Sequence, residues 1–207
     1  MVSEQWVRQA PALRRGDADS ELVRAAQAGA SGAYGELVRR YQNRIYTVIS
    51  GMVADREDAL DLTQETFLKA YASLGSFRQD AGFYTWLYRI AVHRCIDYSR
   101  KRKRRQEPVP LEEFLLQNPR LEPQDTSALR DPERAVMNLQ LRAAIRTALQ
   151  QLREPFRTAV ILRDIEGLSQ EEIATIMGCR RGTVKSRIQR GRSRLRDLLR
   201  PFVQPDD

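Results

Sequence analysis

Residues 167–196 read GLSQEEIATIMGCRRGTVKSRIQRGRSRLR, and this stretch decides the fold of the C-terminal half. Ser169 and Glu172 have the spacing of a capping box, in which the serine oxygen accepts from an unpaired N–H and the glutamate reaches back to the cap. Gly178 then predicts the end of a short helix, because glycine adopts the left-handed conformation at little cost. A second helix is predicted from about Thr183. Two helices joined by so short a turn form a helix-turn-helix.

The second helix of this motif, which spans residues 169–190, combines an apolar inner face with a basic outer face. Its inward positions are Val184, Ile188 and Leu195. Residues 180–200 hold nine Lys or Arg against one acidic residue. Such a helix fits the major groove, where its first turns reach base edges and later arginines meet phosphates. The residues expected to contact the duplex are Thr183, Lys185, Ser186, Arg187, Gln189 and Arg190. The alternative is a solvated charged face.

The composition agrees with a polyanionic partner. The 207 residues include 35 Lys or Arg against 27 Asp or Glu, a net charge of +8. The longest apolar run has four residues, so neither a membrane span nor a signal peptide is expected. Cys95, Cys179 and the single His93 cannot form an ordinary Cys/His zinc site, and we expect no metal and no cofactor. The absence of a CxxC motif fits a reducing cytosol.

The N-terminal half predicts a helical domain over residues 20–104, after a mobile arm at residues 1–19. Apolar residues recur at three- and four-residue steps. One stripe contains Leu37, Tyr41, Ile45, Val48 and Met52, and the other contains Leu60, Phe67, Leu68 and Tyr71. Residues 105–132 hold five of the nine prolines together with several acidic residues, which predicts an extended, flexible linker.

Helical periodicity resumes at Pro132 and predicts a second domain over residues 133–200, followed by a tail at residues 201–207. The expected buried stripe of its first helix contains Val136, Leu139, Ile145, Leu149 and Leu152. The next helix, from Pro155, should turn Phe156, Ala159, Val160 and Ile165 inward and end at Gly167. No run of alternating β-branched residues predicts a strand. The expected fold class is therefore all-α, with two helical domains joined by a flexible linker.

An aromatic and basic segment in the first domain predicts a second nucleic-acid surface. Phe77, Phe83, Tyr84, Trp86 and Tyr88 lie within twelve residues and are interleaved with arginines. Single-stranded bases stack on aromatic faces beside cations. Packing in the core is favoured for Trp86, and both interpretations stay open for the turn from Phe77 to Tyr84. Downstream, residues 100–105 read RKRKRR, which suits either a phosphate backbone or a solubilising tail.

The helix around residues 58–71 carries an acidic face instead. Asp58, Asp61 and Glu65 recur at three- and four-residue spacing, with Gln64 beside them. Carboxylates have little electrostatic reason to face DNA, so this face predicts a protein partner with basic side chains. The alternative is the magnesium site of a nuclease. It is disfavoured because all the carboxylates lie on one helix without a histidine.

Five segments together carry a family resemblance. Residues 61–67 (DLTQETF), 76–78 (SFR) and 83–91 (FYTWLYRIA) resemble region two of bacterial sigma factors. Residues 167–174 (GLSQEEIA) and 182–187 (GTVKSR) resemble region four. With only these two regions and a linker, the chain is similar to the extracytoplasmic-function (ECF, group IV) sigma factors.

The resemblance implies a transcription initiation factor, not an enzyme, that binds core RNA polymerase and directs it to promoters. The implied residues for binding the beta-prime clamp helices are Asp58, Asp61, Gln64 and Glu65, and region four would meet the beta flap. Those implied for the minus-ten element and the opened strand are Phe77, Arg78, Tyr84, Trp86, His93, Arg100, Lys101 and Arg102. The basic helix of the helix-turn-helix would read the minus-thirty-five element.

The resemblance also implies partners and a location. Besides core RNA polymerase and promoter DNA, the chain would bind an anti-sigma factor wedged against both domains. It would work in the cytoplasm in a stress response, held at the inner membrane face by that partner but without membrane insertion. The main rival interpretation is an operator-binding regulator that uses the same motif as a symmetric dimer. A footprint of palindromic half-sites would favour the rival, and two unlike elements would favour a sigma factor.

Overall fold

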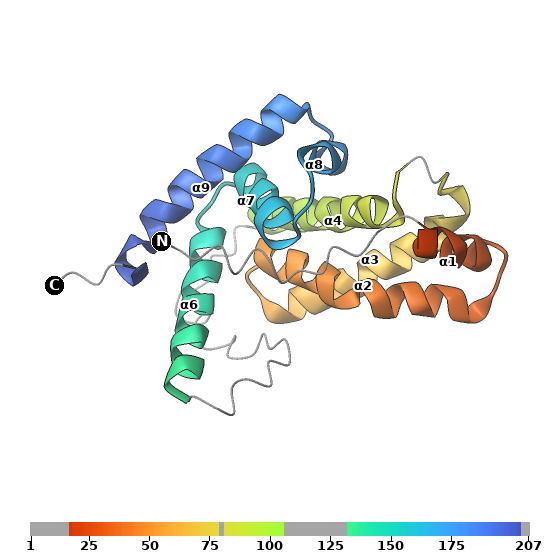
Figure 1. The fold of residues 1–207 in the computed structure, drawn as a ribbon, viewed down its shortest axis with the longest axis horizontal. Helices are drawn as coiled ribbons and strands as arrows, with labels where there is room; N and C mark the ends of the chain where they lie inside the picture. Colours follow the sequence, from red (N-terminus) through yellow and green to blue (C-terminus); the bar gives the residue numbers. More distant parts are fainter. Residues whose placement is uncertain (1–16, 79–80, 106–131, 204–207) are drawn as a thin grey trace.

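The computed structural model describes residues 17–78, 81–105 and 132–203, and every regular element in these ranges is helical (Figure 1). The all-α prediction is therefore confirmed. The N-terminal bundle comprises α1 (Asp17–Gln27), α2 (Ser31–Met52), α3 (Arg56–Ser73), the 3₁₀ turn η2 (Leu74–Ser76) and α4 (Phe83–Arg105). The C-terminal bundle comprises α6 (Pro132–Gln150), α7 (Glu154–Val160), the π-helical turn η4 (Ile161–Ile165), α8 (Gln170–Met177) and α9 (Arg181–Val203).

Most of the predicted arm, linker and tail lies outside the described residues. The arm predicted at residues 1–19 overlaps the structure only where α1 begins, at Asp17. The linker predicted at 105–132 is bounded by the last residue of α4, Arg105, and the first of α6, Pro132. Across the described ranges, no helix is long and apolar enough to cross a membrane.

The N-terminal bundle is organised around α2. Its predicted stripe is buried throughout, from Leu37 to Met52. The second stripe lies on α3 and so marks a helix as predicted, but only Phe67 is buried while Leu60, Leu68 and Tyr71 are exposed. Helix α3 instead turns mostly smaller side chains inward, and small side chains allow close approach to α2 and α4. These inward residues are Ala59, Leu62, Thr66, Phe67 and Ala70.

The C-terminal bundle contains the predicted helix-turn-helix. Glu172 N donates to Ser169 Oγ over 3.2 Å, and Ser169 N donates to Glu172 Oε2 over 2.7 Å, so the capping box is present. Gly178 ends α8 in the left-handed region with φ of 60°. Helix α9 begins at Arg181, two residues earlier than predicted, and it buries Val184 and Ile188.

Two described residues of α6 and η4 that were predicted to be buried are exposed. Ile145 is 36% exposed, because α6 turns Ala144 and Ala148 inward instead. Ile165 is 41% exposed because η4 is a π turn, in which Glu166 N donates to Ile161 O five residues back. That wider turn changes which residue faces inward, and Glu166 takes the buried position. Leu149 and Leu152 are buried as predicted, and the side chains of Val136 and Leu139 lie outside the described set.

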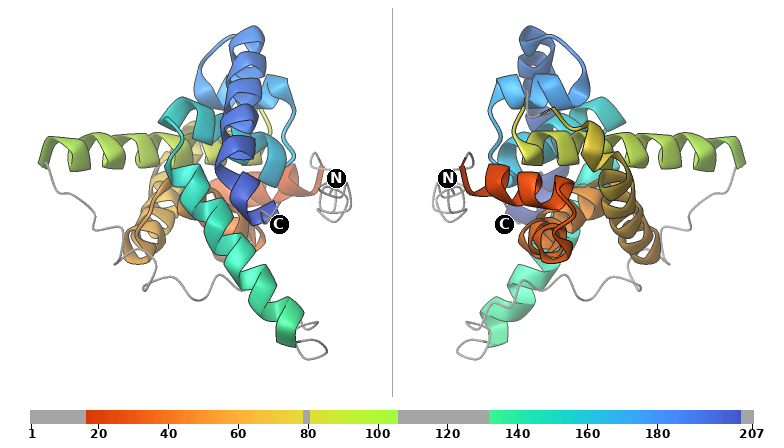
Figure 2. Two further views of the ribbon diagram at one scale, coloured as in Figure 1. Left: turned by 90° about the vertical axis from the view of Figure 1, so that its left-hand side faces the viewer. Right: turned by 90° about the vertical axis from the view of Figure 1, so that its right-hand side faces the viewer.

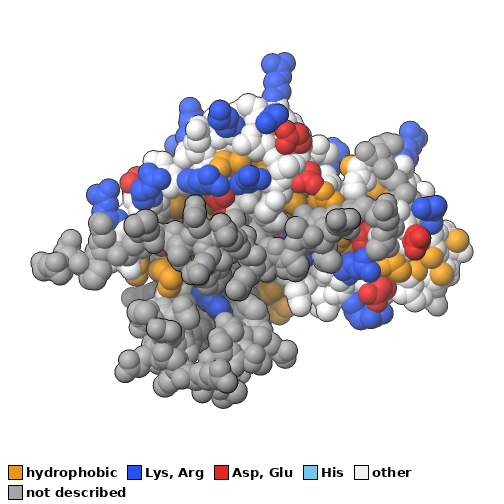
Figure 3. Space-filling model, in the orientation of Figure 1, with side chains coloured by type: hydrophobic (Ala, Val, Ile, Leu, Met, Phe, Trp, Pro, Cys, Tyr) orange, Lys and Arg blue, Asp and Glu red, His pale blue; other side chains and the backbone are white. Residues whose placement is uncertain are grey.

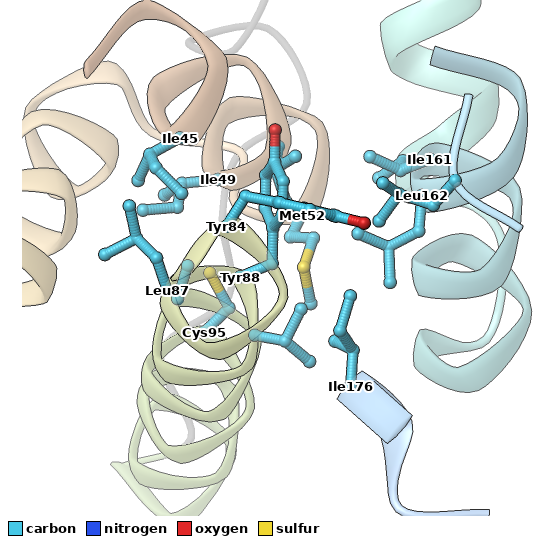
Figure 4. Packing of buried hydrophobic residues seen from close by; sticks show 14 of the residues in the cluster. Ile45, Ile49, Met52, Tyr84, Leu87, Tyr88, Cys95, Ile161, Leu162 and Ile176 are labelled. Carbon is cyan, nitrogen blue, oxygen red and sulfur yellow. The ribbon is translucent and has the colours of Figure 1, made fainter. Parts of the chain in front are cut away.

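The two bundles pack directly against each other, which the sequence did not predict. Figure 4 shows Met52 of α2 with Tyr84 and Tyr88 of α4 facing Ile161, Leu162 and Ile176 of the C-terminal bundle. Helices α4 and α8 form the largest part of this junction, and α2 contacts α6, α7 and η4. The end of α4 and the beginning of α6 project away from the joined body in different directions (Figure 2).

Candidate protein and nucleic-acid interfaces

The exposed face of α3 carries fewer unpaired acidic side chains, and more apolar ones, than the sequence predicted. Asp61, Gln64 and Glu65 are exposed, but Tyr98 donates to Asp58 and Arg94 pairs with Glu65, so α4 engages two of the four predicted residues. The exposed apolar side chains of α3, which sequence reasoning missed as a surface, are Leu60, Leu68 and Tyr71. The only sign of this surface in the sequence was that the apolar stripe of the helix is wider than the stripe needed to pack against its own bundle.

Asp58 ties α3 to the basic end of α4. Arg102 Nη1 lies 3.4 Å from Asp58 Oδ2 and also donates to the Tyr98 hydroxyl over 2.6 Å. Burial, followed by the hydrogen bond to Asp58, raises the pKa of Tyr98 to about 12. Arg102 is therefore half-buried in a structural contact, whereas Arg100 and Lys101 are exposed on α4. Of these three predicted cations, Arg100 and Lys101 are accessible to a phosphate backbone.

The aromatic turn forms a ring cluster at the edge of the N-terminal bundle. The ring centroid of Trp86 lies 4.8 Å from that of Phe77 and 5.7 Å from that of Phe83. Phe83 is buried, while Phe77 and Trp86 are half-buried against the core. Gln27 of α1 fixes the turn, because its Nε2 donates to Leu74 O over 2.9 Å and to Phe77 O over 3.0 Å. The cluster thus both packs and presents ring surface.

The structure separates Tyr84 from the other predicted single-strand residues. Arg78 and His93 are exposed, but Tyr84 is only 9% exposed and its hydroxyl donates to Glu172 of α8. Gly82 allows this placement of the ring, since a Cβ at residue 82 would lie 2.7 Å from Tyr84 Cε1. The C-terminal bundle therefore covers Tyr84.

The basic helix α9 presents part of its predicted face to solvent. Lys185, Gln189 and Arg190 are exposed, and Figure 3 shows Lys and Arg side chains gathered along the upper edge of the molecule, over α9. The other three predicted residues, Thr183, Ser186 and Arg187, are half-buried. Ser186 Oγ donates to the backbone, and Arg187 Nη1 lies 3.5 Å from the sulfur of Cys179.

Two acidic residues position arginines of α9. Arg192 Nε donates to Asp164 Oδ2 over 3.0 Å, its Nη2 donates to the other oxygen, and this hydrogen bonding raises the pKa of Arg192. Arg181 Nη1 lies 2.8 Å from Glu171 Oε1. Both contacts join α9 to neighbouring elements of its own bundle. In the part of the chain that the structure describes, no three His, Cys, Asp or Glu side chains gather as metal ligands.

Comparison with known proteins gives two family matches. Residues 37–105 match the model for sigma-70 region 2, and residues 142–195 match that for sigma-70 region 4. The chain is 41% identical to the RNA polymerase sigma-H factor of Pseudomonas aeruginosa, over 90% of this chain and 96% of that protein. It is 40% identical to the ECF RNA polymerase sigma-E factor of Haemophilus influenzae, over 89% and 97% of the two chains.

Two solved structures share the fold. CnrH in complex with the cytosolic domain of CnrY has a TM-score of 0.65 and 26% identity, covering 89% of this chain and 98% of that one. The sigma factor RpoE of Bartonella quintana, in complex with the anti-sigma factor NepR, has a TM-score of 0.64 and 26% identity, covering 81% and 96%.

Proposed function

The chain belongs to the extracytoplasmic-function sigma factors of the sigma-70 family, and we infer that it is a transcription initiation factor that binds core RNA polymerase and directs it to promoters. The observation that carries this function is the presence of both regions, in order, in this chain, together with its nearly end-to-end match to ECF and sigma-H relatives. Members of this family are not enzymes. The chemistry of transcription belongs to the core polymerase.

The exposed face of α3 is the proposed contact for the beta-prime clamp helices. Asp61 and Gln64 supply polar groups there, and Leu68 and Tyr71 supply exposed apolar area. An interface needs desolvated apolar anchors as well as complementary charge. Asp58 and Glu65 join this face only indirectly, because each is engaged by a residue of α4. Region four, the C-terminal bundle, is proposed to meet the beta flap.

Helix α9 is proposed to read the minus-thirty-five element. Lys185 and Gln189 lie one turn apart on the exposed face and Arg190 follows, which suits insertion into the major groove. An arginine can donate two hydrogen bonds to guanine and a glutamine can pair with adenine. Thr183, Ser186 and Arg187 are proposed to contact the flanking backbone at the groove edge.

The single-strand surface is proposed to run from the aromatic turn along α4. Phe77 and Trp86 offer partly exposed rings, Arg78 follows Phe77 in the chain, and the exposed residues His93, Arg100 and Lys101 lie further along α4. Capture of an unstacked base on such a surface would offset a few kcal/mol of the cost of melting. Tyr84 belongs to this surface by sequence and becomes part of it when α8 no longer covers it.

An anti-sigma factor is the proposed regulatory partner. The two solved relatives described above were both captured with a partner protein, and for the Bartonella quintana protein that partner is an anti-sigma factor. We place the chain in the cytoplasm, where core polymerase works on the chromosome. Retention at the inner membrane face would follow if the anti-sigma factor is itself a membrane protein.

The proposed function is tested by reconstitution with purified bacterial core polymerase on fragmented genomic DNA. Wild type should give discrete start sites preceded by two unlike elements. Asp61→Arg should weaken core binding by tenfold or more, about 1.4 kcal/mol, because it reverses charge at the clamp contact. It should leave binding to duplex DNA intact.

Glu21→Arg is the matched control, because it makes the same charge change at an exposed position of α1. It should behave as wild type. An equal loss of core binding in both variants would show that net charge, and not the α3 face, governs the interaction. Neither core binding nor start sites with wild type would reject the function itself.

A further inference from the structure

Glu166 is a buried carboxylate whose partners all come from the other bundle. It is 4% exposed, and Arg44 of α2 donates to Oε2 from Nε over 3.0 Å, while the Tyr88 hydroxyl of α4 also donates to Oε2. Burial opposes the charge of Arg44, but Tyr88 and Glu166 outweigh it and raise the pKa of that guanidinium. A buried charge is costly unless it is paired. The position of Glu166 is therefore favourable only while the bundles are in contact.

The C-terminal bundle also completes the end of α2. The last carbonyls of a helix have no partner within it and favour a cation nearby. Gly51 O accepts from Gln150 Nε2 over 3.1 Å, and Met52 O accepts from Arg157 Nη1 over 2.6 Å. Gln150 ends α6 and Arg157 lies in α7, so two further elements of the C-terminal bundle are held to α2.

Gly51 makes the close approach possible. A Cβ at this position would lie 2.9 Å from Ile161 Cδ1, closer than ordinary packing allows. Glycine inside a helix costs about 1 kcal/mol relative to alanine. Its use near the end of α2 fits a backbone that the other bundle must approach.

The joined state covers Tyr84 of the proposed single-strand surface and leaves the other two proposed surfaces open. Tyr84 is buried, and its hydroxyl donates a hydrogen bond to Glu172 of α8. In contrast, Asp61 of α3 and Lys185, Gln189 and Arg190 of α9 remain exposed. Core polymerase and duplex DNA can therefore reach the closed chain, whereas single-stranded DNA cannot reach Tyr84.

We propose that the contact between the bundles is an autoinhibitory latch, in which Glu166, Gln150 and Arg157 hold the free chain closed and mask Tyr84 from single-stranded DNA. The claim that closure masks a DNA-binding residue rests on the function proposed above. The claim that the bundles hold each other closed does not depend on that function. Separation of the bundles exposes Tyr84 and Tyr88 together, because both contact the same face of the C-terminal bundle.

The test uses the full chain and two opening variants that act from opposite sides. Glu166→Ala removes the buried carboxylate from the C-terminal bundle, and Gly51→Phe places a wedge on α2 against Ile161. Asp164→Asn is the matched control, since it removes a carboxylate two residues from Glu166 that pairs within its own bundle. Hydroxyl-radical footprinting reports access to Tyr84 and Tyr88, and Tyr41, buried inside the N-terminal bundle, reports unfolding.

Both opening variants should raise oxidation of Tyr84 and Tyr88 severalfold, increase the radius of gyration in solution scattering, and leave Tyr41 protected. Their affinity for a single-stranded minus-ten oligonucleotide should rise severalfold, because a masked site binds in proportion to the open population. Asp164→Asn should change none of these. Unchanged footprints in both variants, or oxidation of Tyr41 together with Tyr84, would overturn the latch.

Opening without a gain in single-strand affinity would overturn the masking and, with it, the assignment of Tyr84 to single-stranded DNA. That outcome is distinct from failure of the proposed function, because the core binding measured with Asp61→Arg does not depend on it.

Discussion

Arg190 and Arg192, two neighbouring arginines of α9, differ in their hydrogen-bond partners. Arg192 is fixed by both carboxylate oxygens of Asp164, whereas Arg190 is exposed beside Gln189. An arginine free to reach a base edge contributes to one position of the recognised sequence. Arg190→Ala should therefore cost about 1–3 kcal/mol at a single base position, measured by competition among duplex variants. Arg194→Ala, one turn further on, should weaken all sequences alike; a uniform loss for Arg190→Ala would make it a phosphate contact.

The two cysteines should differ sharply in reactivity. Burial raises the pKa of the Cys95 thiol to about 12, whereas Cys179 is half-buried in the turn of the helix-turn-helix. The thiolate is the reactive form. Iodoacetamide at about pH 8 should modify Cys179 in the native chain and spare Cys95, as read by peptide mass spectrometry; equal modification of both would contradict the burial of Cys95.

The raised pKa of Cys95 also determines how the free energy of unfolding changes with pH. The folded pKa of Cys95 lies above its ordinary value of 9.0, so its contribution is complete below about pH 9 and is lost as the pH rises towards 12. The free energy of unfolding should fall over that range, and Cys95→Ala should remove this part of the fall.

At the scale of elements, the contact between α7 and α9 depends on Gly191. A Cβ there would lie 2.5 Å from Val160 Cγ2 and 3.1 Å from the backbone oxygen of Phe156, which cannot swing aside. Gly191→Ala gains about 1 kcal/mol of helix propensity but should lose about 1–3 kcal/mol to overpacking, so we expect net destabilisation in urea unfolding. Gly182→Ala, in the same helix with no neighbour within 4 Å of its Cβ, should be neutral or stabilising.

Elements defined by local signals could be predicted, and elements defined by their neighbours could not. The capping box at Ser169 and the left-handed Gly178 depend on residues within one turn, so the helix-turn-helix follows from its own sequence. Ile165 was misplaced because a π turn adds a residue that apolar spacing does not reveal. The exposure of Leu68 and Tyr71 could not be predicted, because an apolar stripe has the same spacing whether it packs in the core or lies on the surface.

The candidate sites show the same division. The exposed face of α9 follows from the motif, but the burial of Tyr84 depends on Glu172, 88 residues away. Likewise, the acidic spacing on α3 could not indicate that Tyr98 and Arg94 engage Asp58 and Glu65. Such long-range contacts depend on how the bundles and helices come together, which periodicity within one element does not encode.

At the scale of the whole molecule, the two bundles share one continuous apolar cluster although 26 residues, 106–131, separate them in sequence. The polar contacts at Glu166 and at the end of α2 give that cluster a specific register. The described molecule is thus a single body, and under the proposed latch it must open before Tyr84 and the basic face of α9 are available together.

The exposed basic face of α9 has a consequence for the cell as a whole. Contacts of Lys and Arg with phosphates release counterions and bind any duplex sequence. If α9 contacts duplex DNA as proposed, closed copies should bind nonspecifically along the chromosome. That binding should keep the unbound concentration low, and a rise in ionic strength should release bound copies to polymerase without new synthesis.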